Sequence, residues 1–412
     1  MELREAAQSI ISAAIRFTLP DEAVVRALRA HDFGHSVYLV AIGKAAWQMA
    51  RAACDYLGEK VVQGIVITKY GHVKGELPRM EMWEAGHPVP DENSCRATAR
   101  AMQMVGGLAA GDTVLFLVSG GGSSLFESPL VPLCELENIT DQLLSCGADI
   151  REINTIRKRL SAVKGGRFAE ICMPAHVYSV VLSDIIGDPL DMIASGPAYP
   201  DASTAKEAQE IAEKYRLSLS GRARALLECE LPRHIGNVES IITGSVRQLC
   251  HAASAESSRL GYEPHVLTAS LNCTARDAGK VLASIAQYHA QTQVPLAFIM
   301  GGETVVRITG NGKGGRNQEL ALAAAPDIAG LPNVAIFSVG SDGTDGPTDA
   351  AGGYVDSQTA GKLEREGIKI EKVLMDNDAY HALERVNGLI MTGPTGTNVN
   401  DLSVLLINPA GS

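Results

Sequence analysis

The sequence predicts an α/β protein with two domains, and three observations support this prediction. Apolar runs of strand length alternate with helical patterns along the chain, which is typical of mainly parallel sheets covered by helices. The 412 residues suffice for two or three domains, and 46% hydrophobic residues can fill a large core. Runs in both halves end in loops rich in Gly, Ser and Asp, as expected where two domains face each other across a cleft.

The first half is expected to open with an amphipathic helix over residues 1–17. Strands are then expected at 37–42, 64–68, 114–118 and 178–183, and a short strand followed by a turn at 83–88. A helix is expected to follow residues 43–46 and to run to about residue 56. Further helices are expected at 94–105, at 149–164, and in a segment that starts at about residue 133. Asp149 is the expected N-cap of the last helix, and Gly165-Gly166 its end.

A domain boundary is expected in the charged, helical region between residues 200 and 237, which divides the chain into domains 1–236 and 237–412. The second domain is expected to open with a strand at 241–243 and to contain a helix at 275–288. Its further strands are expected at 265–268, 296–300, 334–339, 389–391 and 402–407.

Charge and cysteine usage exclude several functional classes. The net charge of −11 gives the chain no general attraction for nucleic acid or anionic lipid. No run of about 18 apolar residues predicts a membrane span, and the N-terminus does not fit a signal peptide. Eight scattered cysteines form no C-x-x-C pair, so neither a zinc site nor a redox dithiol is indicated. We therefore expect a cytoplasmic protein, for which a homodimer is one compatible assembly.

The stretch DTVLFLVSGGGSSLFESP, residues 112–129, joins a buried strand to a glycine-rich loop. Three glycines flanked by hydroxyls expose backbone N–H groups that suit a phosphate or carboxylate. A tight turn between strand and helix is the alternative, but it accounts for only one or two glycines. The spacing is not that of a Walker A loop, so a cation must come from elsewhere. The candidate phosphate-binding residues are Ser119, Gly120, Gly121, Gly122, Ser123 and Ser124.

Two candidate cations lie beside other glycine-rich loops. Lys44 follows a strand in an apolar setting, where it can stay charged facing an anion; a solvated surface lysine is the alternative. Arg316 lies near a helix start, a good place for a carboxylate or phosphate, although a glycine-rich hairpin would account for the same residues. The further candidate substrate-binding residues are Gly301, Gly302, Glu303 and Asn317.

Aspartates at strand ends are the candidates for metal binding or base catalysis. Asp184 and Asp188 flank a turn after a buried strand, where they could hold Mg²⁺, act as a general base, or only cap the turn. Asp342 and Asp345 are weaker metal candidates in a loop that does not fit an EF-hand and that a simple turn cluster also accounts for. Glycine loops, separated cations and aspartates together meet the needs of phosphoryl transfer.

Several stretches together resemble the bacterial-type glycerate 2-kinase family, whose C-terminal part is the MOFRL domain. They are AIGKAA, EAGHPVPD, LVSGGGSSL, INTIRKRLSAVKGG, LSDIIGD with SGP, GGETVV, GKGGRNQELAL, GSDGTDGPTDAAG and GPTGTNVNDL. The resemblance implies a Rossmann-like N-terminal domain, a smaller α/β C-terminal domain and a site in the cleft between them. It also implies ATP-dependent phosphorylation of D-glycerate at its 2-hydroxyl, with functional roles for Lys44 and Arg316.

Two alternatives belong to other functional classes. Members of this family have carried the name hydroxypyruvate reductase, but no strand here is followed by the G-x-G-x-x-G dinucleotide fingerprint. A non-catalytic sensor of sugar acids or nucleotides would keep the glycine loops but has no need of the aspartates.

Overall fold

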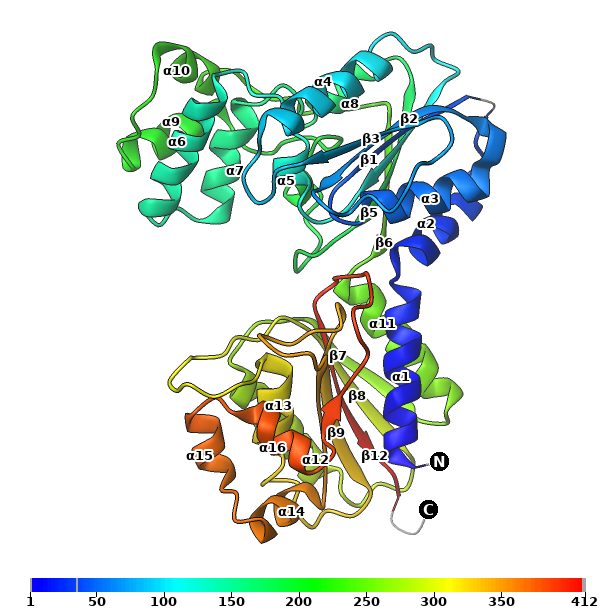
Figure 1. The fold of residues 1–412 in the computed structure, drawn as a ribbon, viewed down its shortest axis with the longest axis vertical. Coiled ribbons are helices and arrows are strands. Elements are labelled where there is room, and N and C mark those ends of the chain that lie inside the picture. Colours follow the sequence, from blue (N-terminus) through cyan, green and yellow to red (C-terminus); the bar gives the residue numbers. More distant parts are fainter. Residues whose placement is uncertain (1, 35, 410–412) are drawn as a thin grey trace. The chain divides into compact units, whose positions relative to one another are not determined.

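The computed structural model describes residues 2–34 and 36–409, and Figure 1 shows two sheets with helices packed on them. Each sheet has six strands, and the chain divides into two compact units. The N-terminal unit comprises Pro20–Ser183 and Asp188–Thr243. The C-terminal unit comprises the chain up to Leu19, the turn Asp184–Gly187, and the chain from Gly244 onward.

The sheet of the N-terminal unit has the strand order β3-β2-β1-β4-β5-β6. Its strands are β1 (Val37–Ile42), β2 (Val61–Lys69), β3 (Met80–Ala85), β4 (Thr113–Val118), β5 (His176–Leu182) and β6 (Val238–Gly244). The pairs from β3 to β5 are all parallel. This is the order of a dinucleotide-binding fold, so the Rossmann-like prediction is confirmed. The order reverses between β1 and β4, and the loops after these two strands therefore lie at the usual ligand crevice of such a sheet.

Helices cover both faces of this sheet. On one face, α2 (Pro20–Arg29) and α3 (Ala46–Leu57) pack against alternate strand residues such as Leu39, Leu115 and Val180. On the other face lie α4 (Glu92–Val105) and α8 (Arg167–Ile171). There the ring of Phe116 from β4 lies 4.8 Å from that of Phe168 in α8. Because helices cover both faces of the sheet, the side chains on both sides of each central strand are buried. This explains why these strands are continuous apolar runs in the sequence.

Four further helices form their own apolar cluster in this unit: α6 (Leu133–Ser145), α7 (Ile150–Arg159), α9 (Ala205–Lys214) and α10 (Gly221–Leu227). Asp149 caps α7 as predicted, in a capping box with Glu152. The helix ends at Arg159 rather than at 164, because the backbone beyond it turns to pair with residues 128–130.

The sheet of the C-terminal unit has the order β11-β10-β9-β12-β8-β7. Its strands are β7 (Glu263–Leu271), β8 (Leu296–Gly302), β9 (Val334–Gly340), β10 (Gly352–Asp356), β11 (Leu389–Ile390) and β12 (Asp401–Ile407). Only β7 and β8 pair in parallel, and the other pairs are antiparallel. The expectation of mainly parallel sheets is therefore wrong for this unit. The fully buried β12 lies between β8 and β9, and its apolar sequence carries no sign of its direction.

The helices of this unit also form two layers (Figure 1). On one face, α1 (Leu3–Phe17) and α11 (Val246–Arg259) pack against residues such as Phe337 and Val404. On the other face lie α12 (Ala275–Tyr288), α13 (Arg316–Ala324), α14 (Thr359–Arg365), α15 (Ile370–Met375) and α16 (Ala379–Arg385). The second layer packs against the alternate residues Ile336 and Leu405.

Two features of the chain organisation differ from the sequence analysis. The strand expected to open the second domain is β6, which pairs into the first sheet; its half-exposed residues suit an edge position. Strand β10 was not predicted, because two of its five residues are glycine. The boundaries between the two compact units also lie elsewhere than between residues 236 and 237. One reason is that α1, at the start of the chain, packs with the C-terminal sheet. The division into domains 1–236 and 237–412 stays a prediction.

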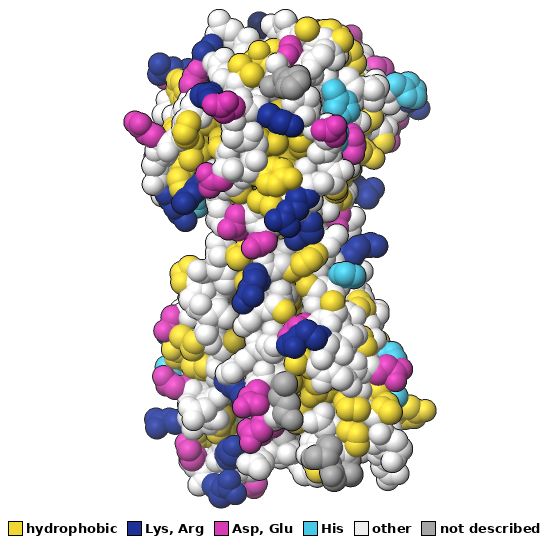
Figure 2. All heavy atoms as spheres, turned by 90° about the vertical axis from the view of Figure 1, so that its right-hand side faces the viewer, with side chains coloured by type: hydrophobic (Ala, Val, Ile, Leu, Met, Phe, Trp, Pro, Cys, Tyr) yellow, Lys and Arg dark blue, Asp and Glu magenta, His cyan; other side chains and the backbone are white. Residues whose placement is uncertain are grey.

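The face of the molecule drawn in Figure 2 is electrostatically mixed. Figure 2 shows Lys, Arg, Asp and Glu side chains interspersed with apolar ones on the face that it presents. Among the described residues, no helix is both long and apolar enough to cross a membrane.

A pair of glycine substitutions tests the sheet packing of the C-terminal unit. A Cβ on Gly352 in β10 would lie 1.9 Å from the carbonyl oxygen of Ser338 in β9, whereas one on Gly361 in α14 would meet nothing within 4 Å. We expect Gly352→Ala to lower the free energy of unfolding by about 1–3 kcal/mol through overpacking. The control Gly361→Ala should raise it by about 0.4–1 kcal/mol. Equal melting temperatures of the two variants would contradict this packing.

Candidate active site

The loops after β1 and β4 are locked together at the reversal of strand order. The Lys44 N–H donates to the carbonyl of Gly120 at 2.9 Å, and Ser119 Oγ accepts from the Ala45 N–H at 3.1 Å while donating to Ile42 O. Gly43 has φ +109°, and a Cβ there would lie 2.3 Å from Ser119 Oγ. Only glycine allows this approach. The predicted ligand residue Ser119 is therefore a buried clamp whose hydroxyl proton is already used.

The backbone of residues 120–123 forms a row of open donors. In the described part of the chain, no acceptor takes the N–H groups of Gly120, Gly121, Gly122 or Ser123. Gly121 is left-handed with φ +87° and precedes the short helix α5 (Gly122–Leu125). A Cβ on Gly122 would lie 2.7 Å from the Cβ of Ala194. Two requirements thus explain the glycines: a left-handed backbone at Gly121 and close packing at Gly122. Their N–H groups remain available to an anion.

Hydrogen bonds to neighbouring protein groups fix the side chains of Ser123 and Ser124. Ser124 Oγ donates to the Gly121 carbonyl at 3.2 Å, and Ser123 Oγ lies 3.0 Å from Ser195 Oγ. Ser195 is fully buried and donates to Asn154 Oδ1 at 3.0 Å. Ser195 also has φ +62°. Such a backbone conformation costs free energy in a residue other than glycine, and residues that adopt it are concentrated at functional sites. Sequence reasoning assigned Ser195 and Asn154 no role, although both lie in stretches that match the family.

Two side chains lie over Gly121. A Cβ on Gly121 would be 3.3 Å from Lys44 Cγ and 2.9 Å from His87 Cδ2. The Lys44 side chain is exposed, and no carboxylate of the described residues lies within ion-pair distance of it. Burial, together with the charges of Lys44, Lys69 and His72, lowers the pKa of His87. The structure therefore brings the predicted Lys44 to the predicted loop and adds a histidine that sequence reasoning missed within EAGHPVPD.

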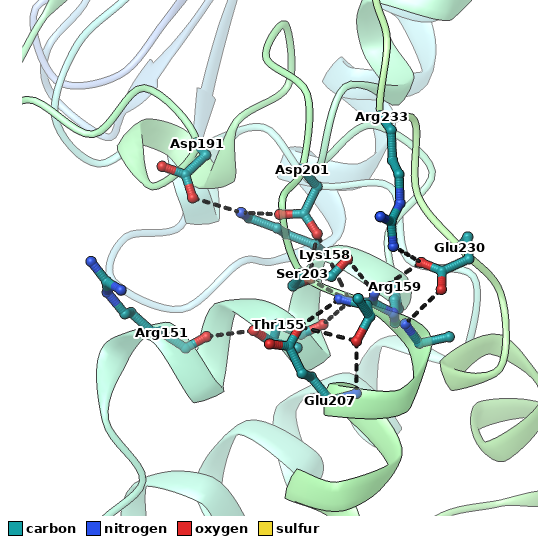
Figure 3. A network of polar contacts seen from close by, with 12 residues as sticks. Arg151, Thr155, Lys158, Arg159, Asp191, Asp201, Ser203, Glu207, Glu230 and Arg233 are labelled. Carbon is teal, nitrogen blue, oxygen red and sulfur yellow. Dashed lines mark hydrogen bonds and ion pairs between the residues drawn. The ribbon is translucent and has the colours of Figure 1, made fainter.

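The cations of INTIRKRLSAVKGG are mostly buried structural groups. Figure 3 shows Lys158 and Arg159 in a network of carboxylates, with Lys158 Nζ 2.6 Å from Asp201 Oδ1. Lys164 Nζ lies 3.0 Å from Glu127 Oε2, and both side chains are fully buried. Such pairs stabilise a unique arrangement only while both partners are present. Arg157 lies 4.0 Å from the same Glu127 carboxylate and also donates to the carbonyl of Ser123 at 3.3 Å, which places a cation next to the loop.

A second cluster lies in the C-terminal unit around Arg316, the first residue of α13. Its Nε and Nη2 donate to the carboxylate of Asp401 at 2.6 and 3.0 Å, and Nη1 donates to Glu303 Oε1 at 2.7 Å. Three of its five N–H groups are thus bound, and two carboxylates outweigh its charge. The predicted neighbours Arg316 and Glu303 do meet, but the sequence did not indicate Asp401. The signal available was GPTGTNVNDL, in which this aspartate is the penultimate residue.

The partners of Arg316 shape its electrostatics. Burial raises the pKa of Asp401, and the hydrogen bonds from Arg316 oppose that shift. Burial is the largest single influence and disfavours the guanidinium charge, but the hydrogen bond to Asp401 and the charges of the neighbouring carboxylates together outweigh it and raise the pKa of Arg316. Asn400 precedes Asp401 and donates to Glu303 Oε2 at 3.3 Å, while its own buried Oδ1 has no partner in the described residues. The cluster therefore offers a polar atom that a ligand could satisfy.

Asp345 caps the first turn of α13, in which Asn317 is the second residue. The Asp345 carboxylate accepts from the backbone N–H groups of Asn317 and Gln318 at 3.1 and 2.9 Å, and thus caps the helix from a distant loop. Burial raises the pKa of Asp345 to about 6, and these hydrogen bonds oppose the shift. Asn317 Oδ1 in turn accepts from Ser338 Oγ at 2.5 Å. Both residues are buried, and their polar groups serve the helix terminus.

Close packing explains the two glycines that end β8. A Cβ on Gly301 would lie 2.4 Å from Cys250 Sγ, and one on Gly302 would lie 2.3 Å from Leu271 O. Gly302 also has φ +150°. Their presence is explained without a phosphate, so a binding role for them stays a prediction.

The remaining predicted aspartates are dispersed. Asp184 O accepts from Asn400 Nδ2 at 3.3 Å in the C-terminal unit, while Asp188 belongs to the N-terminal unit. Asp188 Oδ1 is buried and has no hydrogen-bond partner among the described residues. Asp342 accepts from the Thr344 N–H, and Asp349 accepts from the Tyr380 hydroxyl. Within the described chain, no three His, Cys, Asp or Glu side chains converge as a metal site.

Comparisons with known proteins match this geometry over nearly the whole chain. Residues 6–228 match a domain of unknown function, DUF4147, and residues 296–401 match the MOFRL family. D-glycerate 2-kinase of Thermotoga maritima is 49% identical over 98% of each chain. The chain belongs to the glycerate 2-kinase family. The crystal structure of the Thermotoga glycerate kinase covers 98% of this chain and 99% of its own, with a TM-score of 0.94.

Two other relatives broaden the comparison. Glycerate 2-kinase of Pyrococcus horikoshii is 40% identical over 99% of this chain and 98% of its own. A protein of Agrobacterium vitis that is provisionally named hydroxypyruvate reductase is 36% identical over 98% of this chain and 94% of its own. The family prediction made from the motifs is confirmed, and the reductase name recurs within the family.

The cap at Asp345 predicts a measurable pH dependence. Its pKa is about 6 in the folded protein against an ordinary 3.8, so the folded state binds this proton more tightly. The resulting stability is complete below about pH 4 and is lost as the pH rises through 6, by about 1.4 kcal/mol for each unit of pKa shift. Asp345→Asn should remove this dependence, as measured by unfolding curves between about pH 4 and 7.

Asp349→Asn is the matched control for this measurement. The hydrogen bond from Tyr380 lowers the pKa of Asp349, so its stability contribution is lost as the pH falls. The difference between wild type and variant should therefore change with pH in opposite directions for the two substitutions. Parallel pH profiles of wild type and Asp345→Asn would mean that Asp345 keeps its ordinary pKa.

Proposed function

We propose that this protein transfers the γ-phosphoryl group of ATP to the 2-hydroxyl of D-glycerate, giving 2-phospho-D-glycerate and ADP. The observation that carries the proposal is the 49% identity to a D-glycerate 2-kinase over nearly the full length of both chains. The open N–H groups of residues 120–123 beside Lys44 support it independently, because phosphoryl transfer needs preorganised donors and cations around the phosphates. A cytoplasmic setting and a homodimer remain predictions.

The N-terminal unit is proposed to hold the phosphates. The donors at Gly120, Gly121, Gly122 and Ser123 need no reorganisation, because the clamp at Ser119 fixes the loop. Lys44 adds a charge that no described carboxylate neutralises. Ser124 supports the turn through its bond to Gly121 rather than by contact with the ligand.

Arg316 is proposed to act on the substrate with its remaining N–H groups, oriented by Asp401 and Glu303. A guanidinium fixed in this way is rigid, so little side-chain entropy is lost when it binds a carboxylate or phosphoryl oxygen. Asn317, Gly301 and Gly302 are proposed to maintain the same cluster from α13 and β8.

Mg²⁺ is the proposed metal, and the residues present fit it in part. Asp188 offers a buried carboxylate oxygen without a hydrogen-bond partner in the described chain, the ligand type that Mg²⁺ prefers. Asp184 is proposed as a second ligand or as the base that accepts the hydroxyl proton. Asp342 is a weaker candidate, and Asp345 is already a helix cap. When bound, Mg²⁺ offsets the charge of the phosphates.

A direct assay separates the proposed kinase from a reductase. Incubation with D-glycerate, ATP and Mg²⁺ should give ADP and a single phosphorus NMR signal of 2-phosphoglycerate. In parallel, NADH with hydroxypyruvate should show no oxidation above background. Exclusive formation of 3-phosphoglycerate, or NADH oxidation without ADP formation, would refute the proposal. Binding of ATP and glycerate without turnover would favour a sensor.

Substitution of the two cations tests their roles. Lys44→Met and Arg316→Lys should each lower kcat/KM by roughly 10²–10³-fold, the cost of deleting one charge-stabilising group or its fork geometry. Lys206→Met, on the surface of α9, is the matched control and should leave kcat/KM unchanged. A double-mutant cycle then measures whether Lys44 and Arg316 act on the same step.

Stability must be separated from chemistry at Arg316. Its removal leaves the buried Asp401 carboxylate without its partner, so Arg316→Gln alone should lower the melting temperature. The double variant Arg316→Gln, Asp401→Asn should recover stability but not activity. Recovery of both would mean that Arg316 has only a structural role.

The two roles proposed for Asp184 differ in their response to metal. Asp184→Asn should lower kcat under either role. If Asp184 binds Mg²⁺, excess Mg²⁺ should restore part of the rate, whereas the loss of a base should persist at any concentration. Asp342→Asn is the control and should change kcat less. An Asp184→Asn enzyme with wild-type kcat and kcat/KM would remove Asp184 from the reaction.

A further inference from the structure

His87 lies at the loop that is proposed to bind phosphate. It follows β3, and its ring packs over Gly121. A Cβ on Gly121 would be 3.0 Å from His87 Nε2 and 3.3 Å from Lys44 Cγ. An imidazole, a lysine side chain and an open backbone donor thus meet at one point. This spacing is close enough for all three to reach one bound group.

The imidazole of His87 makes no polar contact that would fix it in place. Neither ring nitrogen has a hydrogen-bond partner among the described residues, and the ring is only half-buried. The nearby His72 differs, because its Nδ1 lies 3.0 Å from the Lys44 carbonyl oxygen. A polar ring that packs on this loop without a protein partner in the described chain can bind a ligand held there.

The charges around His87 are mainly positive. Lys44 follows β1, Lys69 ends β2, and His72 lies in the next loop; together with burial, all three lower the pKa of His87. Asp91 approaches the preceding Gly86, but its carboxylate accepts hydrogen bonds from Tyr70 and Ser94. Burial and these charges favour the neutral form of His87, and an arriving polyanion would reverse the sign of its surroundings.

We propose that His87 is a substrate-contacting residue whose imidazole binds the phosphoryl group held at residues 120–123. This inference rests on the proposed phosphate role of that loop. The neutral ring can donate one hydrogen bond to a phosphate oxygen, and the imidazolium form has two donors. Because the phosphate charge favours the imidazolium form, ligand binding raises the pKa of His87, and by linkage ATP binds more tightly as the pH falls.

Nuclear magnetic resonance of the wild-type protein provides the first test. Histidine ring signals are titrated between about pH 5 and 8, without and with saturating ATP, while the backbone amides of residues 120–123 are followed. We expect those amides to shift with ATP and the pKa of His87 to rise by about one unit, which corresponds to about tenfold tighter binding of ATP to the protonated form. The ring signals of His72 should change less when ATP is added.

A matched pair of variants provides the second test. His87→Gln should weaken ATP binding by about tenfold at about pH 6 and should flatten its pH dependence, whereas His72→Gln should leave both nearly unchanged. Amide shifts at 120–123 without a change in the His87 pKa would overturn the role of His87 while leaving the loop as the phosphate site. No amide shift on ATP binding would overturn the loop, and with it the contact to His87.

Discussion

The close approach of Gly43 to Ser119 is the constraint on which the N-terminal unit depends. The two residues end neighbouring strands at the point where the strand order reverses, and a single Cβ on Gly43 would separate them. The Ser119 hydroxyl donates to the end of β1 and accepts from the loop that follows it, so the loop after β4 is fixed without using the N–H groups of the next four residues. A preorganised donor row costs no reorganisation when charge arrives, which is the basis of electrostatic catalysis.

The C-terminal unit fixes a charged side chain, Arg316, rather than a row of backbone donors, and it does so with carboxylates. Arg316 lies at the start of α13, where a positive charge is unfavourable to the helix dipole, and the two carboxylates of Asp401 and Glu303 offset it. Asp345 caps the same helix from a loop far along the chain. The fork of Arg316 is thereby fixed in direction by residues from distant segments. Such a cluster positions a cation accurately but leaves it little net charge.

The sequence predicted the residues that carry local signals and missed those that depend on long-range contacts. The buried strand and the turn around Gly121 could be predicted, because an apolar run that ends in consecutive glycines is typical of a buried strand followed by a loop of unusual backbone geometry. Asp401 and Ser195 could not be assigned, because their partners lie far away in the chain, at Arg316 and Asn154. The direction of the C-terminal strands was also hidden, since a fully buried strand reads as apolar whether its neighbours are parallel or antiparallel.

Net charge explains how the candidate site can be selective in an acidic protein. With a formal charge of −11, a polyanion is not attracted to the surface in general, and the mixed face in Figure 2 agrees with this. Attraction must therefore be local. Lys44 is a cation without a carboxylate partner in the described chain, whereas Lys158 and Lys164 are buried in ion pairs. Open backbone donors beside one unpaired lysine, with a neutral histidine that can take up charge, form a site whose positive potential is confined to where phosphate would bind.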